Sequence, residues 1–352
     1  MKYRFLITAI ILCSVLQING QNIENELSDY DFALNELELN YAGFPRKTSG
    51  GQFENYKFKR DSLRSEVMNG SCRGYDAVAK LFAWFEDFHL QCGGWLTEKY
   101  MQRQQKSYSD SCEYSPKSLA TIVDTTTFLI RFPSCAGKEP SSEWIENSVK
   151  DFLSSGCENL ILDVRGNGGG SDMFIQEYIA LLYDQPGTVP CVKIRNGESN
   201  RNYMREVSKR HYRKMKKHKD SVFVSLRPHI MPFKMKRISP LPKKAAIIID
   251  GRVASVAEGM LMNLRSCSSR TRFYGRDNTM GCLDHCNARY LELPNSKVKF
   301  CIPMTRSYYL TDFNINIDDT GIVPDVYIKL PLPEKLTDNI DEWVLWVAKD
   351  LK

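Results

Sequence analysis

A short stretch, LILDVRGNGGG over residues 160–170, constrains the fold of this chain more than any other. Its apolar first half is bounded by turn-forming residues, which predicts a buried strand. The glycines that follow tolerate positive φ and carry no side chain, so a ligand or another backbone segment can come close to them. An apolar-periodic segment over residues 173–183 then predicts a helix. A strand, a glycine turn and a helix in this order direct backbone N–H groups toward a negatively charged group.

The segments on both sides of this stretch predict an α/β architecture. Residues 120–132 are rich in Thr, Ile, Val and Phe, which predicts a strand. A helix follows, opened by a Ser N-cap after Pro140 and ended at Gly156. Together with the strand of the glycine stretch this makes a βαβ unit, so we expect a largely parallel sheet with helices packed on it. The sequence AAIIID over residues 245–250 predicts another buried strand, and residues 256–264 predict another helix.

Composition divides the chain into segments of different character. We expect a signal peptide over residues 1–20, a small helical N-terminal domain over 21–105, an α/β core over 118–332 with a basic excursion over 196–240, and a C-terminal helix over 333–352.

The first twenty residues have the pattern of a secretory signal peptide. Lys2 and Arg4 precede an apolar run that is too short to favour a membrane-spanning helix, and small residues follow up to Gly20. No later stretch is long and apolar enough to span a membrane. We therefore expect an exported protein, periplasmic or extracellular, without a membrane span. Nothing in the sequence predicts an oligomeric state.

The positive charge of the chain is concentrated in one segment. Residues 201–219 contain nine Lys or Arg and one Glu, whereas the whole chain carries a formal net charge of +6. The rest of the exported chain is slightly acidic, which argues against a general nucleic-acid surface, and we expect no nucleic-acid partner. The basic segment itself is either a solvated face or a lid or docking surface for acidic groups.

Cysteines are numerous for a chain of this size. Of the eleven, Cys13 leaves with the signal peptide and ten remain. An exported chain with an even number of cysteines could form several disulfides, which cannot be paired from sequence alone. Cys282 and Cys286 flank His285 at roughly metal-ligand spacing, but no second Cys/His pair at short spacing accompanies them. We therefore expect disulfides or buried thiols here rather than a zinc site.

Ser255 stands at a second predicted strand-to-helix turn. Such a turn exposes the hydroxyl group, and the helix N-terminus offers N–H groups and a positive dipole end to an oxyanion, which suits a nucleophile. Taken alone, however, a Ser in this position is commonly just a helix N-cap. The surrounding motifs bear on the choice between these interpretations.

Four segments of the chain resemble, in the same order, the motifs of peptidase family S41. They read LILDVRGNGGG, VASVAEG, GRDNTMG and DDTGIVPDV. The second resembles the family's nucleophile segment T-A-S-A-A-E, with Ser255 at the nucleophile position, and the third resembles G-E-x-T-x-G through Thr279 and Gly281. The family includes C-terminal processing proteases, tricorn-type peptidases and the interphotoreceptor retinoid-binding protein repeats. The resemblance covers residues 118–332.

The resemblance implies a fold and a reaction. The expected core is a crotonase-like ββα-spiral with a helical N-terminal domain. The expected reaction is hydrolysis of a peptide or protein substrate, for which no metal or organic cofactor is needed. Only about thirty residues separate His89 from Ala120, too few for the PDZ domain that many processing proteases insert there, so we expect none.

The general base departs from that of the processing proteases. They carry a Lys directly after the motif glycine, where this chain has Cys282, and no Lys lies between Arg276 and Pro294. The chain is therefore similar to the tricorn-like branch, which uses a His base, rather than to the Ser–Lys branch. His89 is the best candidate for the base, because an imidazole titrates near neutral pH. His285 is the competing candidate.

The resemblance implies a role for each candidate residue. Ser255 would attack the scissile carbonyl, while His89 would take its proton and later give it to the leaving amine. Asp318 falls where the tricorn-like branch carries its acid and would stabilise the imidazolium, directly or through an intermediary. Asp87, two residues before His89, is an alternative orienting group.

The oxyanion would rest on the backbone N–H of Val256 and on that of Gly168 or Gly169. Because the family Lys is missing and the surroundings of the His differ from those of tricorn-type members, a second function stays open. In that case the chain would be a catalytically inactive family member that binds peptides or other ligands.

Overall fold

The computed structural model describes residues 22–94, 113–137, 139–227 and 229–352. The expected signal peptide, Cys112 and the end of the expected N-terminal domain lie outside these residues. The chain forms two compact units. The first unit contains the residues up to 97 together with 193–226 and 285–306, and the second unit contains residues 98–192, 227–284 and 307–352.

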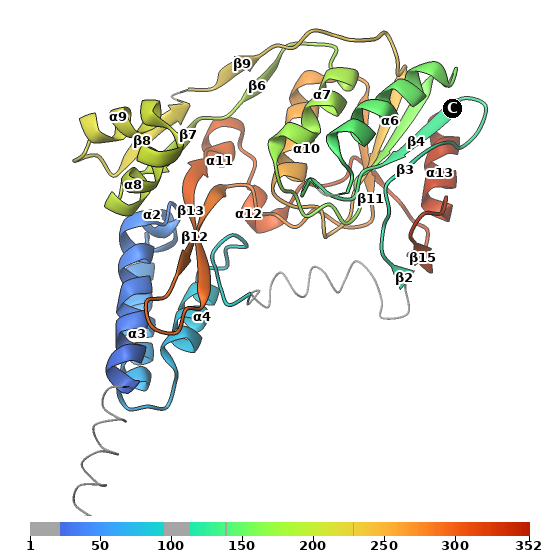
Figure 1. Ribbon diagram of the computed structural model, residues 1–352. Helices are drawn as coiled ribbons and strands as arrows, with labels where there is room; N and C mark the ends of the chain where they lie inside the picture. The colour runs from blue at the N-terminus through green and yellow to red at the C-terminus, as the bar shows by residue number, and fades with distance from the viewer. Residues whose placement is uncertain (1–21, 95–112, 138, 228) are drawn as a thin grey trace, which may run out of the picture. The chain divides into compact units, whose positions relative to one another are not determined.

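A six-stranded sheet forms the centre of the second unit (Figure 1). In spatial order its strands are β14 (Val326–Tyr327), β11 (Thr271–Gly275), β10 (Lys244–Ile248), β5 (Asn159–Asp163), β4 (Thr127–Arg131) and β3 (Leu119–Ile122). All neighbours are parallel except β3 and β4, which are antiparallel. The predicted βαβ unit is confirmed, because β4 and β5 are parallel neighbours with a helix between them in the chain.

The single strand predicted over residues 120–132 is wrong in one respect. The chain turns between Ile122 and Thr127, so two strands form and pair with each other. Asp124 makes this turn, since its Oδ1 accepts hydrogen bonds from the N–H and the hydroxyl of Thr126 at 2.8 and 2.9 Å. An Asp side chain that binds the backbone two residues on favours a turn over a continuous strand.

Helices cover both faces of this sheet (Figure 1). The helices of the second unit are α6 (Ser142–Ser154), η1 (Asp172–Ile175), α7 (Gln176–Leu182), α10 (Val256–Cys267), α11 (Tyr309–Phe313), α12 (Ile317–Thr320) and α13 (Glu342–Asp350). Trp343 of α13 packs in one buried cluster with Leu129 of β4. The neighbouring Phe128 points to the opposite face, where its ring lies 5.9 Å from that of Phe152 in α6. Burial on both faces explains the nearly continuous apolar sequences of β5 and β10.

Two short ribbons complete the second unit. Strand β2 (Glu113–Tyr114) is parallel to β15 (Lys335–Leu336), and β6 (Gly187–Val189) is antiparallel to β9 (Met231–Phe233).

The first unit combines helices with a five-stranded sheet. Its helices span residues 22–40, α2 (Phe44–Lys47), α3 (Gln52–Met68), α4 (Gly74–Trp84), α8 (Glu198–Val207) and α9 (Lys209–Lys217). The sheet order is β1 (Gln91–Cys92), β13 (Lys299–Ser307), β7 (Val192–Arg195) and β8 (Phe223–Arg227), and β12 (His285–Glu292) also pairs with β13. The ring of Phe82 in α4 lies 6.0 Å from that of Phe300 in β13, so helices and sheet share one core. Within the described residues, no helix combines the length and the apolar character that a membrane crossing needs.

Candidate active site

Ser255 joins a buried strand to a helix in a sharp turn. Strand β10 ends at Ile248 and α10 begins at Val256, so Ser255 is the N-cap residue of α10, and its backbone has φ 55° and ψ −117°. The N-caps Ser141 and Asp341 of this chain have the ordinary extended conformation, with φ −77° and −93°. A left-handed φ at a residue other than glycine costs on the order of 1–3 kcal/mol. Ser255 is therefore held in a conformation that capping alone does not require.

The glycine stretch packs directly against this turn. Gly169 has φ 89°, and a Cβ added to it would lie 2.8 Å from the Cβ of Ser255 and 2.9 Å from the backbone N of Val256. Any side chain at position 169 would thus collide with the turn. At Gly168, in contrast, an added Cβ would meet no atom within 4 Å, so this residue borders open space.

Two backbone N–H groups beside Ser255 have no hydrogen-bond acceptor among the described residues. They belong to Val256, the first residue of α10, and to Gly168. The N–H of Gly169 differs, since it donates to Oδ1 of Asn167 at 3.0 Å. Asn167 is fully buried, and its Nδ2 donates to the carbonyl of Phe132 at 2.9 Å, which fixes its orientation. Of the two predicted glycine donors, Gly168 has its N–H available and Gly169 does not.

A buried carboxyl group, that of Glu258, connects the motif segments of the second unit. It accepts hydrogen bonds from the backbone N–H of Ser255 (3.1 Å), Gly281 (2.8 Å) and Cys282 (3.0 Å) and from the hydroxyl of Thr279 (2.6 Å). Burial raises the pKa of Glu258 in spite of these hydrogen bonds. The sequence prediction did not include this residue, although Ser255 and Glu258 have the spacing of a capping box.

Cys282, at the position of the family lysine, is buried and tied to the same carboxyl group. It is 2 % exposed, and its Sγ donates to Oε2 of Glu258 at 3.4 Å. Hydrogen bonds from Cys282 to Glu258 through both the backbone and the thiol hold this side chain away from solvent. The nine cysteines that the structure describes form no disulfide with one another, and no group of three or more His, Cys, Asp or Glu among the described residues is arranged to hold a metal ion.

Asp318 lies in the short helix α12 of the second unit. It is 4 % exposed, and its Oδ1 accepts a hydrogen bond from the backbone N–H of Asp284 at 2.7 Å. The carboxyl group of Asp318 therefore holds the chain at the residue that precedes His285 in sequence.

The two candidate histidines belong to the first unit, where Asp87 binds both of them. Oδ2 of Asp87 lies 3.1 Å from Nδ1 of His285 and accepts a hydrogen bond from the hydroxyl of Tyr41 at 2.6 Å. Oδ1 accepts the backbone N–H of His89 at 2.9 Å. Burial favours a raised pKa for Asp87, but the hydrogen bond from His285, the charges of His285 and His89 and the hydrogen bond from Tyr41 hold the pKa well below its usual value. Asp87 thus binds the ring of His285 and the backbone of His89.

Exposure separates the two histidines further. His285 is 1 % exposed, whereas His89 is partly exposed and its ring lies 5.4 Å from that of Phe88. The second unit therefore brings together Ser255, Val256 and the two glycines, and it also contains Asp318, while His89 and His285 are joined through Asp87 in the first unit.

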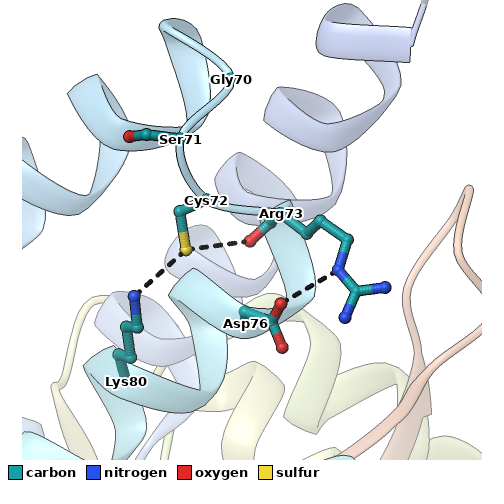
Figure 2. A pocket seen from close by; sticks show the side chains of 6 residues that line it. All are labelled: Gly70, Ser71, Cys72, Arg73, Asp76 and Lys80. Atoms are coloured by element: carbon teal, nitrogen blue, oxygen red, sulfur yellow. Dashed lines mark hydrogen bonds and ion pairs between the residues drawn. The ribbon is translucent and has the colours of Figure 1, made fainter.

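A hollow in the first unit lies apart from all of these residues. It has a volume of about 460 Å³ and is lined by Gly70, Ser71, Cys72, Arg73, Asp76 and Lys80 (Figure 2). Nζ of Lys80 donates to Sγ of Cys72 at 3.4 Å, and Nε of Arg73 donates to Asp76 at 3.0 Å. None of the predicted site residues lines it.

Comparisons with known proteins relate the fold to solved structures. A protein from Parabacteroides merdae ATCC 43184, named as a candidate peptidase, has a TM-score of 0.58 at 15% identity, covering 88% of this chain and 89% of that one. Mature CPAF has a TM-score of 0.60 at 11% identity, covering 87% of this chain and 93% of that one. A lipoprotein from Streptococcus agalactiae has a TM-score of 0.50 at 14% identity, covering 87% and 93%. At these identities the likeness shows a common fold.

The sequence itself carries the family relationship. No curated protein matches the chain, but the model of peptidase family S41 matches residues 126–328. This match includes all four motif segments and spans more than half of the chain. The protein belongs to peptidase family S41 and is a serine-type peptidase, a hydrolase that acts on peptide bonds.

Proposed function

We propose that this protein is an exported peptidase in which Ser255 is the nucleophile, His89 is the general base and Asp318 supports the base. The observation that carries the proposal is the backbone of Ser255, a partly exposed residue that has a φ of 55° in the turn before α10. Nucleophilic serines of hydrolases occupy such strained strand-to-helix turns. The packing of Gly169 against Ser255 supports the same assignment, because the turn and the glycine stretch are shaped to each other.

The oxyanion hole is formed by the N–H groups of Val256 and Gly168. Both lack an acceptor among the described residues, and Val256 adds the positive end of the α10 dipole. Gly169 has a different role, since its N–H is engaged by Asn167 and its missing side chain admits Ser255. The two glycines of the motif thus have different roles: Gly168 donates a hydrogen bond to the substrate, and Gly169 leaves space for Ser255.

The reaction proceeds in two proton-balanced halves. Oγ of Ser255 forms a bond to the scissile carbonyl carbon while Nε2 of His89 accepts the hydroxyl proton, and the carbonyl oxygen takes up the negative charge. When the intermediate collapses, the C–N bond breaks and the proton passes from His89 to the leaving amine. A water molecule then attacks the acyl ester with His89 again as base, and the proton returns to Oγ of Ser255.

His89 is preferred to His285 as the base because of exposure. A base must meet the substrate's leaving group, and His285 is 1 % exposed while His89 is partly exposed. One observation favours His285 instead: the carboxylate of Asp87 lies at its Nδ1. A carboxylate at this ring nitrogen commonly orients a catalytic imidazole. Asp318 supports the base directly or through an intermediary, and its Oδ1 also accepts the backbone N–H of Asp284.

A Ser–Lys mechanism is not supported. Cys282 stands at the lysine position, and its thiol, which is buried, donates to Glu258. At the position of the family lysine the chain thus has a thiol that donates a hydrogen bond to a buried carboxyl group.

A fluorophosphonate probe tests the nucleophile and the base in one experiment. The exported protein should be labelled, the label should be lost in Ser255→Ala, and the labelling rate should fall at least tenfold in His89→Ala but remain near wild type in His285→Ala. Unchanged labelling of His89→Ala, with loss in His285→Ala, would transfer the base role to His285. No labelling of folded wild-type protein would favour the inactive ligand-binding alternative. Sequencing of the exported protein tests the export proposal, which expects a mature N-terminus near residue 21.

A further inference from the structure

Helix α9 has a solvent-facing side made entirely of basic residues. Its sequence is KRHYRKMKK, and Met215 is its buried residue. At about 100° per residue, the positions outside the stripe of Met215, Tyr212 and His211 form one broad outer face. All of them are exposed and basic: Lys209, Arg210, Arg213, Lys214, Lys216 and Lys217. Figure 1 shows α9 beside α8 and β8.

The charges on this outer face are not neutralised. Among the described residues, none of its six cations forms an ion pair, and the one hydrogen bond it makes is from Nζ of Lys214 to the carbonyl of Ser225 at 2.7 Å. Several arginines elsewhere in the same unit are paired: for example, Arg64 binds Asp31 at 2.8 Å, and Arg289 binds Glu36. The first unit therefore has acids to pair its cations, but not at α9.

The basic residues at the start of α9 oppose helix stability, whereas Lys214, Lys216 and Lys217 in its last turn are favourably placed for the helix dipole. Lys209 and Arg210 stand in the first turn, which contains no acid, so they lie at the positive end of the helix dipole. Like charges face each other at i,i+4 in the pairs Lys209/Arg213, Arg210/Lys214 and Arg213/Lys217. A helix shaped by stability alone would carry acids at its start and opposite charges at these spacings. A loss of stability of this kind is typical of residues that are retained for binding.

The helix is nevertheless firmly seated. Met215 packs with Met204 of α8, Val224 of β8 and Met304 of β13 in one buried cluster. The charges are thus presented on a fixed scaffold about 13 Å long, given nine residues with a rise of 1.5 Å each.

We propose that the outer face of α9 is an exosite that binds an acidic segment of the polypeptide substrate. The inference rests on the proposed peptidase function. The face complements a run of carboxylates in charge, and its length matches about four residues of extended chain at 3.3 Å each. Exposed ion pairs are individually weak, so binding comes from several contacts together and is sensitive to salt.

Two other polyanions fit this face less well. A helix that binds a membrane surface presents apolar residues beside its basic ones, whereas Met215 of α9 is buried in the unit and Tyr212 packs against the same cluster. Single-stranded nucleic acid is held by aromatic side chains on which bases stack, and the outer face of α9 has none.

Binding is measured on the full-length Ser255→Ala protein, so that the readout is independent of catalysis. A fluorescent peptide with four consecutive Glu residues should bind at low salt and should be released as salt rises, while the same peptide with four Gln residues should not bind. The variant Lys209→Gln/Arg210→Gln/Arg213→Gln/Lys216→Gln should lose at least tenfold in affinity. The matched control, Lys117→Gln/Lys150→Gln/Lys234→Gln/Lys236→Gln, removes four exposed cations elsewhere and should change affinity less than twofold.

The proposal would be overturned if the α9 variant bound the Glu peptide as tightly as the protein with the wild-type surface does. It would also be overturned if the protein preferred anionic phosphatidylserine vesicles or single-stranded DNA to the Glu peptide. In the active enzyme, the α9 variant should raise KM for a Glu-tagged substrate at least fivefold with kcat unchanged, and it should leave a neutral substrate unaffected. If neither substrate is cleaved by wild-type enzyme, the proposed function fails while the binding measurement still decides the exosite.

Discussion

Replacing Glu258 by Gln is expected to loosen the nucleophile turn while leaving the hydrophobic core intact. Each oxygen of this carboxyl group accepts two hydrogen bonds from backbone or hydroxyl donors: Thr279 and Gly281 on Oε1, and Ser255 and Cys282 on Oε2. An amide keeps an acceptor on one side only. At least two donors would therefore face an NH₂ group in a buried site.

The size of the effect follows from these contacts. Each buried hydrogen bond to a charged group contributes about 1.5–3 kcal/mol, so two lost bonds cost about 3–6 kcal/mol. Burying an uncharged amide is cheaper than burying a carboxylate, which offsets part of the loss. We expect the free energy of unfolding to fall by about 2–4 kcal/mol. Because the left-handed φ of Ser255 persists only where its surroundings hold it, the labelling rate by a fluorophosphonate should fall by at least tenfold.

The pH dependence adds a second signature. Burial raises the pKa of Glu258 above its ordinary value of 4.5. A carboxyl group with a raised folded-state pKa contributes stability that is fully present below pH 4.5 and is lost as the pH rises through the folded pKa. Glu258→Gln has no titrating group at this site, so the decline in stability above pH 4.5 should become shallower than in wild type.

Urea unfolding at several pH values and the rate of probe labelling measure both effects. Glu146→Gln, at an exposed position of α6, is the matched control and should change neither. Wild-type stability together with wild-type labelling in Glu258→Gln would refute the reasoning, since it would mean that the carboxyl group does not hold the turn. Loss of stability with unchanged labelling would show that Ser255 keeps its conformation without Glu258.

Three further outcomes are expected. Gly169→Ala should cut the labelling rate at least tenfold and destabilise the protein by about 1–2 kcal/mol, because its Cβ meets the nucleophile turn at a positive φ, whereas Gly168→Ala should keep wild-type stability in urea unfolding. Asp87→Asn should lower the free energy of unfolding by about 3 kcal/mol at pH 7, because it breaks a buried pair. The depressed pKa of Asp87 stabilises the wild-type protein above about pH 4, and this contribution is lost as the pH falls further. In urea unfolding at several pH values, the stability of the variant should therefore decline less steeply than that of the wild type in acid. A thiol reagent should modify at most two of the nine described cysteines in the native protein, and reaction of all nine without denaturant would contradict their burial. These two are Cys72 and Cys286.

The local part of the site could be predicted from the sequence. The turn at Ser255 and the glycine stretch each depend on a few consecutive residues, whose strand, turn and helix preferences agree with the structure. Contacts between residues far apart in sequence could not be predicted. Nothing near Asp87 or His285 in sequence indicates that the two pair, and Glu258 looks like an ordinary capping-box residue until Thr279 is brought to it.

Pairing of strands shows the same limit. Strand β1 is two residues long and is defined only by its antiparallel partner β13, which comes some two hundred residues later. A segment so short has no periodicity of its own, so its structure depends on the tertiary fold. The turn at Asp124 was missed for the opposite reason, since the surrounding residues have such strong strand preference that they masked a local turn signal.

The motif LILDVRGNGGG contains two parts with different physical roles. Asp163 and Arg165 belong to a fully buried network with Arg131 and Asp341, in which two cations and two anions balance. Burial favours a raised pKa for Asp163, but the charges and hydrogen bonds of Arg165 and Arg131 hold its pKa well below the usual range, so it stays ionised. Through Asp341, the N-cap residue of α13, this network fixes the end of β5.

The glycine half of the motif starts where that network ends. Asn167 continues from the fixed strand end, and its side chain and carbonyl hold Gly169 and Ala254 on either side of the nucleophile turn. A buried ion network contributes little net stability over apolar packing, but it permits one geometry and penalises others. We infer that the four buried charges are retained because they place a glycine within contact distance of Ser255. A variant in which apolar residues replace this network should therefore fold stably but react with the fluorophosphonate more slowly than the wild type.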